Sequence, residues 1–197
     1  MTNYFVGDSF TWFMSLDPQS VDIQKVKSKK VWDEISPMFE IGSYQNFEST
    51  FVFRMATTAG SLTDDVLSDM FNKITIDQGS NMVFLFGKMD LDSRLPIRKN
   101  TYEVVDQYFK VCAEFAKKHG CNPRFVGPMY GGDSEEYDKF INKLGYNCYI
   151  NNIPQPIILI DSLIPRNYPH GDIWGHMTYE DNKKSIEYIL DQLQAGI

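Results

Sequence analysis

Short apolar runs recur along the chain and alternate with stretches of helical periodicity. The run at 81–86, NMVFLF, is apolar at nearly every position. Such a run is typical of a central parallel strand, because both faces of that strand are buried. We predict strands at Tyr4–Val6, Phe51–Phe53, 81–86 and Arg124–Val126, and a further one at Pro156–Ile160.

Between these runs, apolar residues return every three to four positions, which predicts helices with one buried face. The three stripes are Leu67, Met70, Phe71 and Ile74; Val105, Phe109, Cys112 and Ala116; and Ile186, Ile189, Leu190 and Leu193. Gly120 is expected to end the second helix. Alternating strands and helices predict an α/β fold with a mostly parallel sheet covered on both faces. Ligands of such sheets bind beyond the carboxyl ends of the strands, so the loops there hold the candidate residues.

Composition narrows the class of protein. The 197 residues suit one domain, 1–197, and 43% of them are hydrophobic, which excludes a disordered chain. The net charge is −7, and Lys and Arg do not cluster, so no nucleic-acid partner is expected. No apolar stretch approaches the roughly 18 residues of a membrane span, and no signal peptide is apparent. The three cysteines fit no metal spacing, and buried free thiols in the cytoplasm are expected.

The first candidate loop is Gly7-Asp8-Ser9, directly after the first predicted strand. A serine there would present its hydroxyl at the edge of the sheet where ligands bind. The alternative is that Ser9 caps the following helix, since serine is a favoured N-cap residue. The same tripeptide recurs at 132–134, where Asp133 or Ser134 is interpreted as a helix cap.

The second candidate loop follows the second predicted strand and holds Gly60. Ser61 and Asp64 have the spacing of a capping box, which places Gly60 immediately before a helix. There its amide could approach a substrate oxygen closely, although an ordinary turn glycine is an equally good interpretation. The third loop, at 87–90, contains Lys88, Met89 and Asp90.

The fourth loop, at 171–178, contains His176 shortly before the last predicted helix. Thr178 and Asp181 again have capping-box spacing, so His176 is expected just outside that helix. A histidine near a carboxylate suits a general base, and we expect it within hydrogen-bond reach of Ser9. The alternatives are an ordinary loop histidine, or His170 as the base, although no clear helix follows His170.

Together the four loops resemble the blocks of the GDSL/SGNH hydrolase superfamily. FVGDS matches the first block, TTAGSLTDDVL is similar to the second, FLFGKMD to the third, and GHMTYEDNKKSIEYIL to the segment around the last-block histidine. The resemblance implies a three-layer flavodoxin-like fold. It also implies a Ser9 nucleophile, a His176 base oriented by Asp172, and an oxyanion hole formed by the amides of Ser9 and Gly60.

Two positions depart from the family pattern. Met89 stands where the family has an oxyanion-binding Asn, and a methionine side chain cannot donate a hydrogen bond. Asp172 precedes His176 by four residues, where the family spacing is three. Met89 and Asp90 therefore belong to the expected oxyanion and substrate-binding corner, in an altered form.

These observations predict a serine esterase that removes an acyl group, such as acetyl, from a small or carbohydrate-like substrate. No metal or organic cofactor is required by this chemistry. A non-catalytic binding module of the same fold is the contrasting interpretation, and it is favoured by Met89 and the displaced Asp172. An acyltransferase using the same site is the third interpretation.

Overall fold

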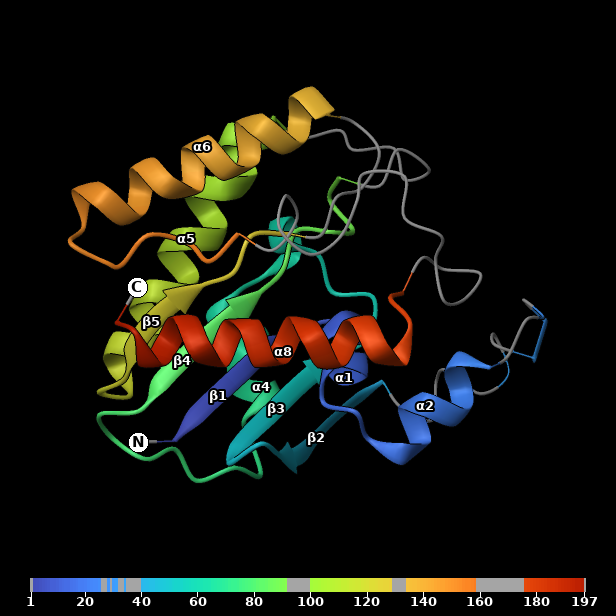
Figure 1. Ribbon diagram of the computed structural model, residues 1–197. Coiled ribbons are helices and arrows are strands. Elements are labelled where there is room, and N and C mark those ends of the chain that lie inside the picture. Colours follow the sequence, from blue (N-terminus) through green and yellow to red (C-terminus); the bar gives the residue numbers. More distant parts are fainter. Residues whose placement is uncertain are drawn as a thin grey trace.

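The computed structural model describes residues 2–25, 28, 30–31, 34, 40–91, 100–128, 134–158 and 176–196. Its centre is a five-stranded sheet with the strand order β2-β3-β1-β4-β5 (Figure 1). The strands are β1 (Asn3–Gly7), β2 (Ile41–Asn46), β3 (Ser49–Arg54), β4 (Asn81–Leu85) and β5 (Asn122–Phe125). All neighbouring pairs are parallel except β2–β3, which is an antiparallel hairpin at one edge.

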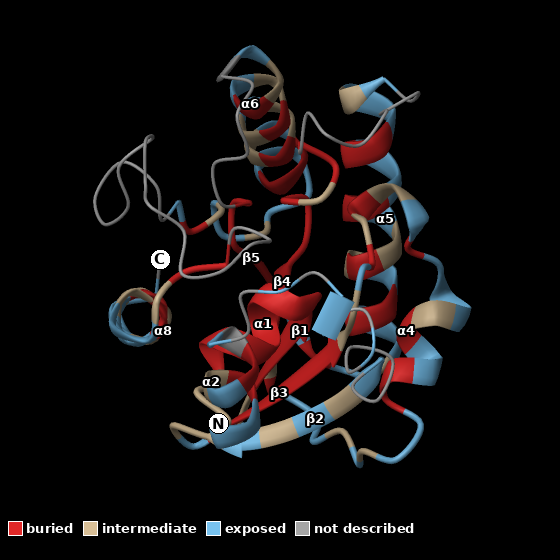
Figure 2. Ribbon diagram, turned by 90° about the vertical axis from the view of Figure 1, so that its right-hand side faces the viewer, coloured by how far each residue is buried: buried red, intermediate tan, exposed pale blue. Residues whose placement is uncertain are grey.

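Helices cover both faces of the sheet, so the fold has three layers. On one face lie α1 (Ser9–Met14) and α8 (Tyr179–Gln194), and on the other lie α4 (Asp64–Met70), α5 (Thr101–Lys118) and α6 (Ser134–Ile150). A short helix, α2 (Pro18–Gln24), follows α1. Figure 2 shows the two groups of helices on opposite sides of the buried strands. The predicted α/β architecture of the flavodoxin-like type is therefore confirmed.

Each face of the sheet has its own apolar core, because side chains alternate between the faces along a strand. Val6, Val52 and Phe84 point toward α4 and α5, where Tyr108 and Phe115 of α5 are almost completely buried. On the other face the strands contribute Phe5, Phe51, Val83 and Leu85, which pack against residues of α1 and α8. None of the helices in the described residues has the length and apolarity needed to cross a bilayer.

Four strands were predicted close to their observed positions, and the fifth prediction is met by a single bridge. Ile157 pairs in parallel with Val126, while 159 and 160 lie outside the described residues. The edge strand β2 was not predicted. Two local expectations are wrong: α4 ends at Met70, before Ile74, and Gly60 does not stand directly before α4. It lies inside a 3₁₀ turn, η2 (Ala59–Ser61), in which Ser61 bonds back to Thr58 while Thr63 caps α4.

Candidate active site

Ser9 is held at the carboxyl end of β1 by a tight turn into α1. Asp8 is the N-cap of α1, and its Oδ1 accepts a hydrogen bond of 2.9 Å from the N–H of Phe10. Ser9 is thus the first residue of the helix, and its hydroxyl does not serve as the cap. A side chain at Gly7 would collide with the Thr11 hydroxyl and the Leu85 carbonyl, which require glycine at this position.

His176 reaches the same place from the other end of the chain. It stands just before α8, whose N-cap is Thr178 as predicted; the Thr178 Oγ1 accepts from the N–H of Asp181. The imidazole is 3% exposed and packs against two rings of α1, with centroid distances of 4.6 Å to Phe10 and 4.2 Å to Phe13. These contacts fix the plane of the imidazole.

The structure brings the two predicted side chains together. The Ser9 Oγ lies 2.8 Å from the Nε2 of His176, and both residues are buried. When the imidazole proton is on Nδ1, Nε2 accepts from the serine hydroxyl, which is the arrangement needed to remove its proton. The site can therefore generate an oxygen nucleophile.

The residues around the expected oxyanion hole, Gly60, Met89 and Asp90, are arranged differently from the expectation. The two carboxylate oxygens of Asp90 accept hydrogen bonds from the N–H of Ala59, at 2.7 Å, and of Gly60, at 2.9 Å. The Gly60 amide is therefore already engaged by an anion. Met89, the residue before Asp90, is half-buried, and its side chain has no hydrogen-bond donor. The two backbone donors expected for the oxyanion were the N–H groups of Ser9 and Gly60. Asp90 accepts from Gly60, which leaves the N–H of Ser9 as the expected donor.

Asp8 is an unusual buried acid next to the serine. It is 1% exposed, and its Oδ2 has no hydrogen-bond partner among the described residues. Burial is the main reason why the pKa of Asp8 is raised to about 7; the charge of Asp90 also raises it, while the N–H of Phe10 and the charge of Lys88 lower it. Asp8 and Lys88 line a cavity of about 20 Å³.

Two predicted residues of the site lie outside the described part of the chain. Asp172 and His170 lie in the undescribed segment 159–175, so the partner that orients His176 stays a prediction. Ser134 is the first residue of α6, and 132–133 lie outside the described residues, so the capping of this helix by Asp133 or Ser134 stays a prediction.

Sequence reasoning missed three features of the site. It did not assign Asp8 as the cap, the two phenylalanines as the walls around His176, or Asp90 as the acceptor for the η2 turn. A usable signal existed for the phenylalanines: Phe10 and Phe13 are three residues apart and so share one helical face. No three His, Cys, Asp or Glu side chains in the described residues converge as metal ligands would.

No protein-family model matches this chain, and comparison with curated proteins likewise finds no match.

Proposed function

We propose that this protein is a serine esterase with Ser9 as nucleophile and His176 as general base. The observation that carries the proposal is the 2.8 Å contact between the Ser9 Oγ and the His176 Nε2 at the carboxyl end of the central strand. A serine there, with its hydroxyl oxygen within hydrogen-bond distance of an imidazole nitrogen, has the geometry of nucleophilic acyl transfer. The resemblance to the GDSL/SGNH hydrolases supports the same chemistry.

In the proposed reaction, the Ser9 oxygen attacks an ester carbonyl while His176 takes the hydroxyl proton. His176 then protonates the leaving alcohol, and the acyl group remains on Ser9 until water, activated by His176, releases it as an acid. The N–H of Ser9 is the proposed donor to the oxyanion. Asp172 is proposed to orient His176. The substrate class is an acyl ester, such as acetyl, of a small or carbohydrate-like alcohol, and no metal or organic cofactor takes part.

The three cysteines support a cytoplasmic site of action. Cys112, Cys121 and Cys148 are free and buried, as expected of a protein in a reducing compartment.

A specific observation favours a second candidate, a non-catalytic binding module. The Gly60 amide is taken by Asp90, and Met89 cannot replace the missing donor. Loss of one oxyanion donor typically costs about 10²–10³ in rate, so the remaining chemistry would be slow. If an alcohol replaces water as the acceptor, the same site is an acyltransferase.

Labelling with a fluorophosphonate separates the candidates, because this reagent reacts only with an activated serine. We expect wild type to be labelled and Ser9→Ala to lose the label. His176→Ala should react about 10²-fold more slowly or slower still, because a general base typically contributes about 10²–10⁴ in rate. Ser134→Ala is the matched control, since it removes the serine of the second Gly-Asp-Ser tripeptide, and it should label like wild type. Label on Ser134, or none on wild type, would overturn the proposal. A panel of acetylated sugars and p-nitrophenyl esters then identifies the substrate.

A further inference from the structure

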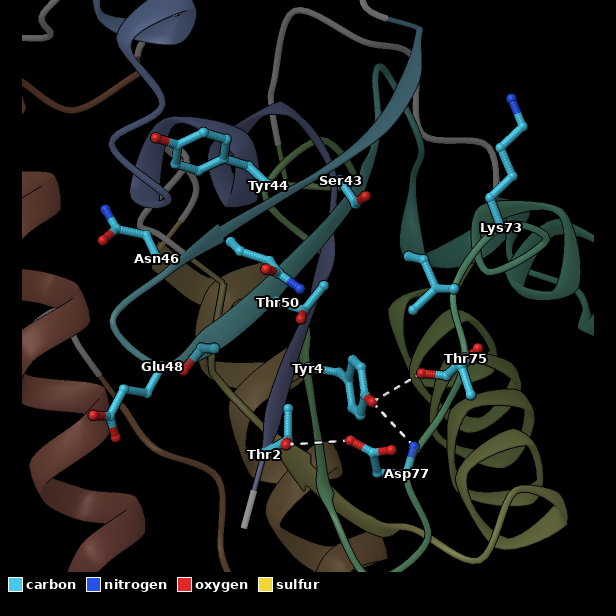
Figure 3. A pocket seen from close by; sticks show the side chains of 13 residues that line it. Thr2, Tyr4, Ser43, Tyr44, Asn46, Glu48, Thr50, Lys73, Thr75 and Asp77 are labelled. Carbon is cyan, nitrogen blue, oxygen red and sulfur yellow. Dashed lines mark hydrogen bonds between the residues drawn. The ribbon is translucent and has the colours of Figure 1, made fainter.

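A polar pocket lies at the opposite end of the sheet from Ser9. It encloses about 700 Å³ and is lined by Thr2, Tyr4, Ser43, Gln45, Thr50 and Asp77 together with their neighbours (Figure 3). Thr2 and Tyr4 stand at the amino end of β1, whereas Ser9 follows its carboxyl end. Gly7 lies three positions after Tyr4 along the strand, or about 10 Å at 3.3 Å per residue. The polar pocket is therefore not part of the esterase site.

The floor of the pocket is a row of polar side chains on one face of the sheet. In the strand register Gln45 is opposite Thr50, and Thr50 is opposite Tyr4, so the three side chains are neighbours on that face. Two residues further along, Val52 and Val6 occupy the same face and are buried under the helices. The face therefore changes from apolar to hydrogen-bonding where α4 no longer covers it.

One wall of the pocket is fixed by hydrogen bonds to Tyr4. The hydroxyl of this buried tyrosine donates to the carbonyl of Thr75, at 3.1 Å, and accepts from the N–H of Asp77, at 3.0 Å. The Thr2 hydroxyl donates to the Asp77 carboxylate. Figure 3 shows these bonds joining the segment around Thr75 to β1. The pocket is thus preformed, which lowers the entropic cost of binding a ligand.

The hydroxyl of Thr50 faces this pocket. Thr50 is 8% exposed, and no hydrogen bond joins its Oγ1 to any described residue. Figure 3 shows the side chain pointing into the space between β3 and Tyr4. A ligand in the pocket can donate to this hydroxyl or accept from it, in the place of water.

The chemistry of the lining selects the ligand. An apolar ligand would bury the Thr50 hydroxyl and the Gln45 amide without partners. An anion would need converging cations, and Lys73, the cation of the lining, points away from the cavity while Glu48 and Asp77 are acidic. A neutral ligand with many hydroxyls satisfies donors and acceptors alike, and a volume of about 700 Å³ falls within the usual 300–1,000 Å³ of small-molecule sites.

We propose that this polar pocket binds a neutral saccharide, independently of Ser9. The proposal goes beyond the esterase function and does not rest on it. It assigns hydrogen bonds to the sugar from the Thr50 hydroxyl and the Gln45 amide.

The test measures binding to the Ser9→Ala variant, so that ester hydrolysis plays no part. Cellobiose, xylobiose, maltose and diacetylchitobiose are titrated at millimolar concentrations while backbone amide resonances are followed by NMR. We expect at least one of them to shift amides around Thr50 and Thr75. Gln45→Ala and Thr50→Val should each weaken that binding about fivefold, the effect of one lost hydrogen bond.

Gln194→Ala, on the exposed end of α8, is the matched control and should bind like the parent. Denaturant midpoints show whether Thr50→Val is folded. The absence of shifts with all four sugars, or shifts confined to residues around Ser9 and His176, would overturn the proposal. So would unchanged affinity in both folded pocket variants. If fluorophosphonate does not label the wild-type protein, the esterase proposal is contradicted, whereas the saccharide proposal is unaffected.

Discussion

Ser9 stands one residue inside α1, because Asp8 takes the capping position. Serine and aspartate are about equally favoured as N-caps, so residue preference alone does not decide between them. The backbone decides: the Asp8 carboxylate reaches the Phe10 N–H. The serine hydroxyl is left to hydrogen-bond with His176. A shift of the helix start by a single residue would have used that hydroxyl as a cap.

We predict that Asp8→Asn makes the free energy of unfolding less dependent on pH. Asp8 has a pKa of about 7 in the folded protein and about 3.8 when unfolded, so the native state holds its proton more tightly. Stability linked to Asp8 is then fully present below about pH 4 and is lost as the pH rises toward about 7. Asn keeps the cap but cannot ionise. The stability of the variant relative to wild type should rise by about 2–3 kcal/mol between about pH 5 and about pH 8.

Urea unfolding of both proteins at the two pH values measures this difference. A gap between variant and wild type that stays constant with pH would show that the pKa of Asp8 is not raised in the folded protein.

At the scale of elements, one carboxylate joins two loops that leave the strands on either side of β1. Asp90 follows β4, and it accepts from two successive N–H groups of η2, which follows β3. A carboxylate holding two backbone donors is a strong connection, since charge-assisted hydrogen bonds exceed neutral ones. The η2 turn is therefore positioned by Asp90 as well as by its own capping box.

Asp90→Asn should loosen this connection. The amide group of Asn would face one of the N–H donors, so one buried hydrogen bond is lost at a cost of about 1–3 kcal/mol. Urea unfolding measures the loss, and faster hydrogen exchange at the Gly60 amide identifies its location. The matched control is Asp64→Asn, which removes an exposed ion pair with Lys118 and should cost less than about 1 kcal/mol. Equal effects of the two substitutions would contradict this role of Asp90.

The same scale explains what the sequence could and could not predict. The buried strands β1, β3 and β4 carry apolar runs, and their positions follow from those runs. Strand β2 has no such run: it alternates between exposed and half-buried residues and contains Gly42 and Asn46, which are uncommon in strands. Pairing with β3 determines it, and pairing is a tertiary interaction. Ser9 and His176 were found because each borders a readable element: Ser9 follows the strand β1, and His176 precedes the helix α8. The contact of Asp90 with η2 has no counterpart in local sequence.

At the scale of the whole molecule, the two apolar cores differ in their relation to the candidate site. The core beneath α1 and α8 holds His176 against Ser9, whereas the core beneath α4, α5 and α6 is on the other side of the sheet. Loss of packing in the first core should disturb the site more than an equal loss in the second.

Ile186→Ala and Leu144→Ala test this division. Both side chains are fully buried, Ile186 in the α8 core and Leu144 in the α6 core, and each truncation should cost about 2–5 kcal/mol. In conditions where both variants remain folded, we expect Ile186→Ala to slow fluorophosphonate labelling several-fold more than Leu144→Ala. Equal labelling of the two variants at matched stability would contradict a special role of the α8 core in supporting the site.

The hydrogen bond between Ser9 and His176 spans 167 positions of the chain. During synthesis the serine leaves the ribosome early, and its partner follows only after the sheet and the helices of the opposite face have emerged. Contacts of such long range form late in folding, because the loop must close before they contribute. The nascent serine therefore stays without its base, and any reactivity that depends on the pair is withheld until the last helix has docked.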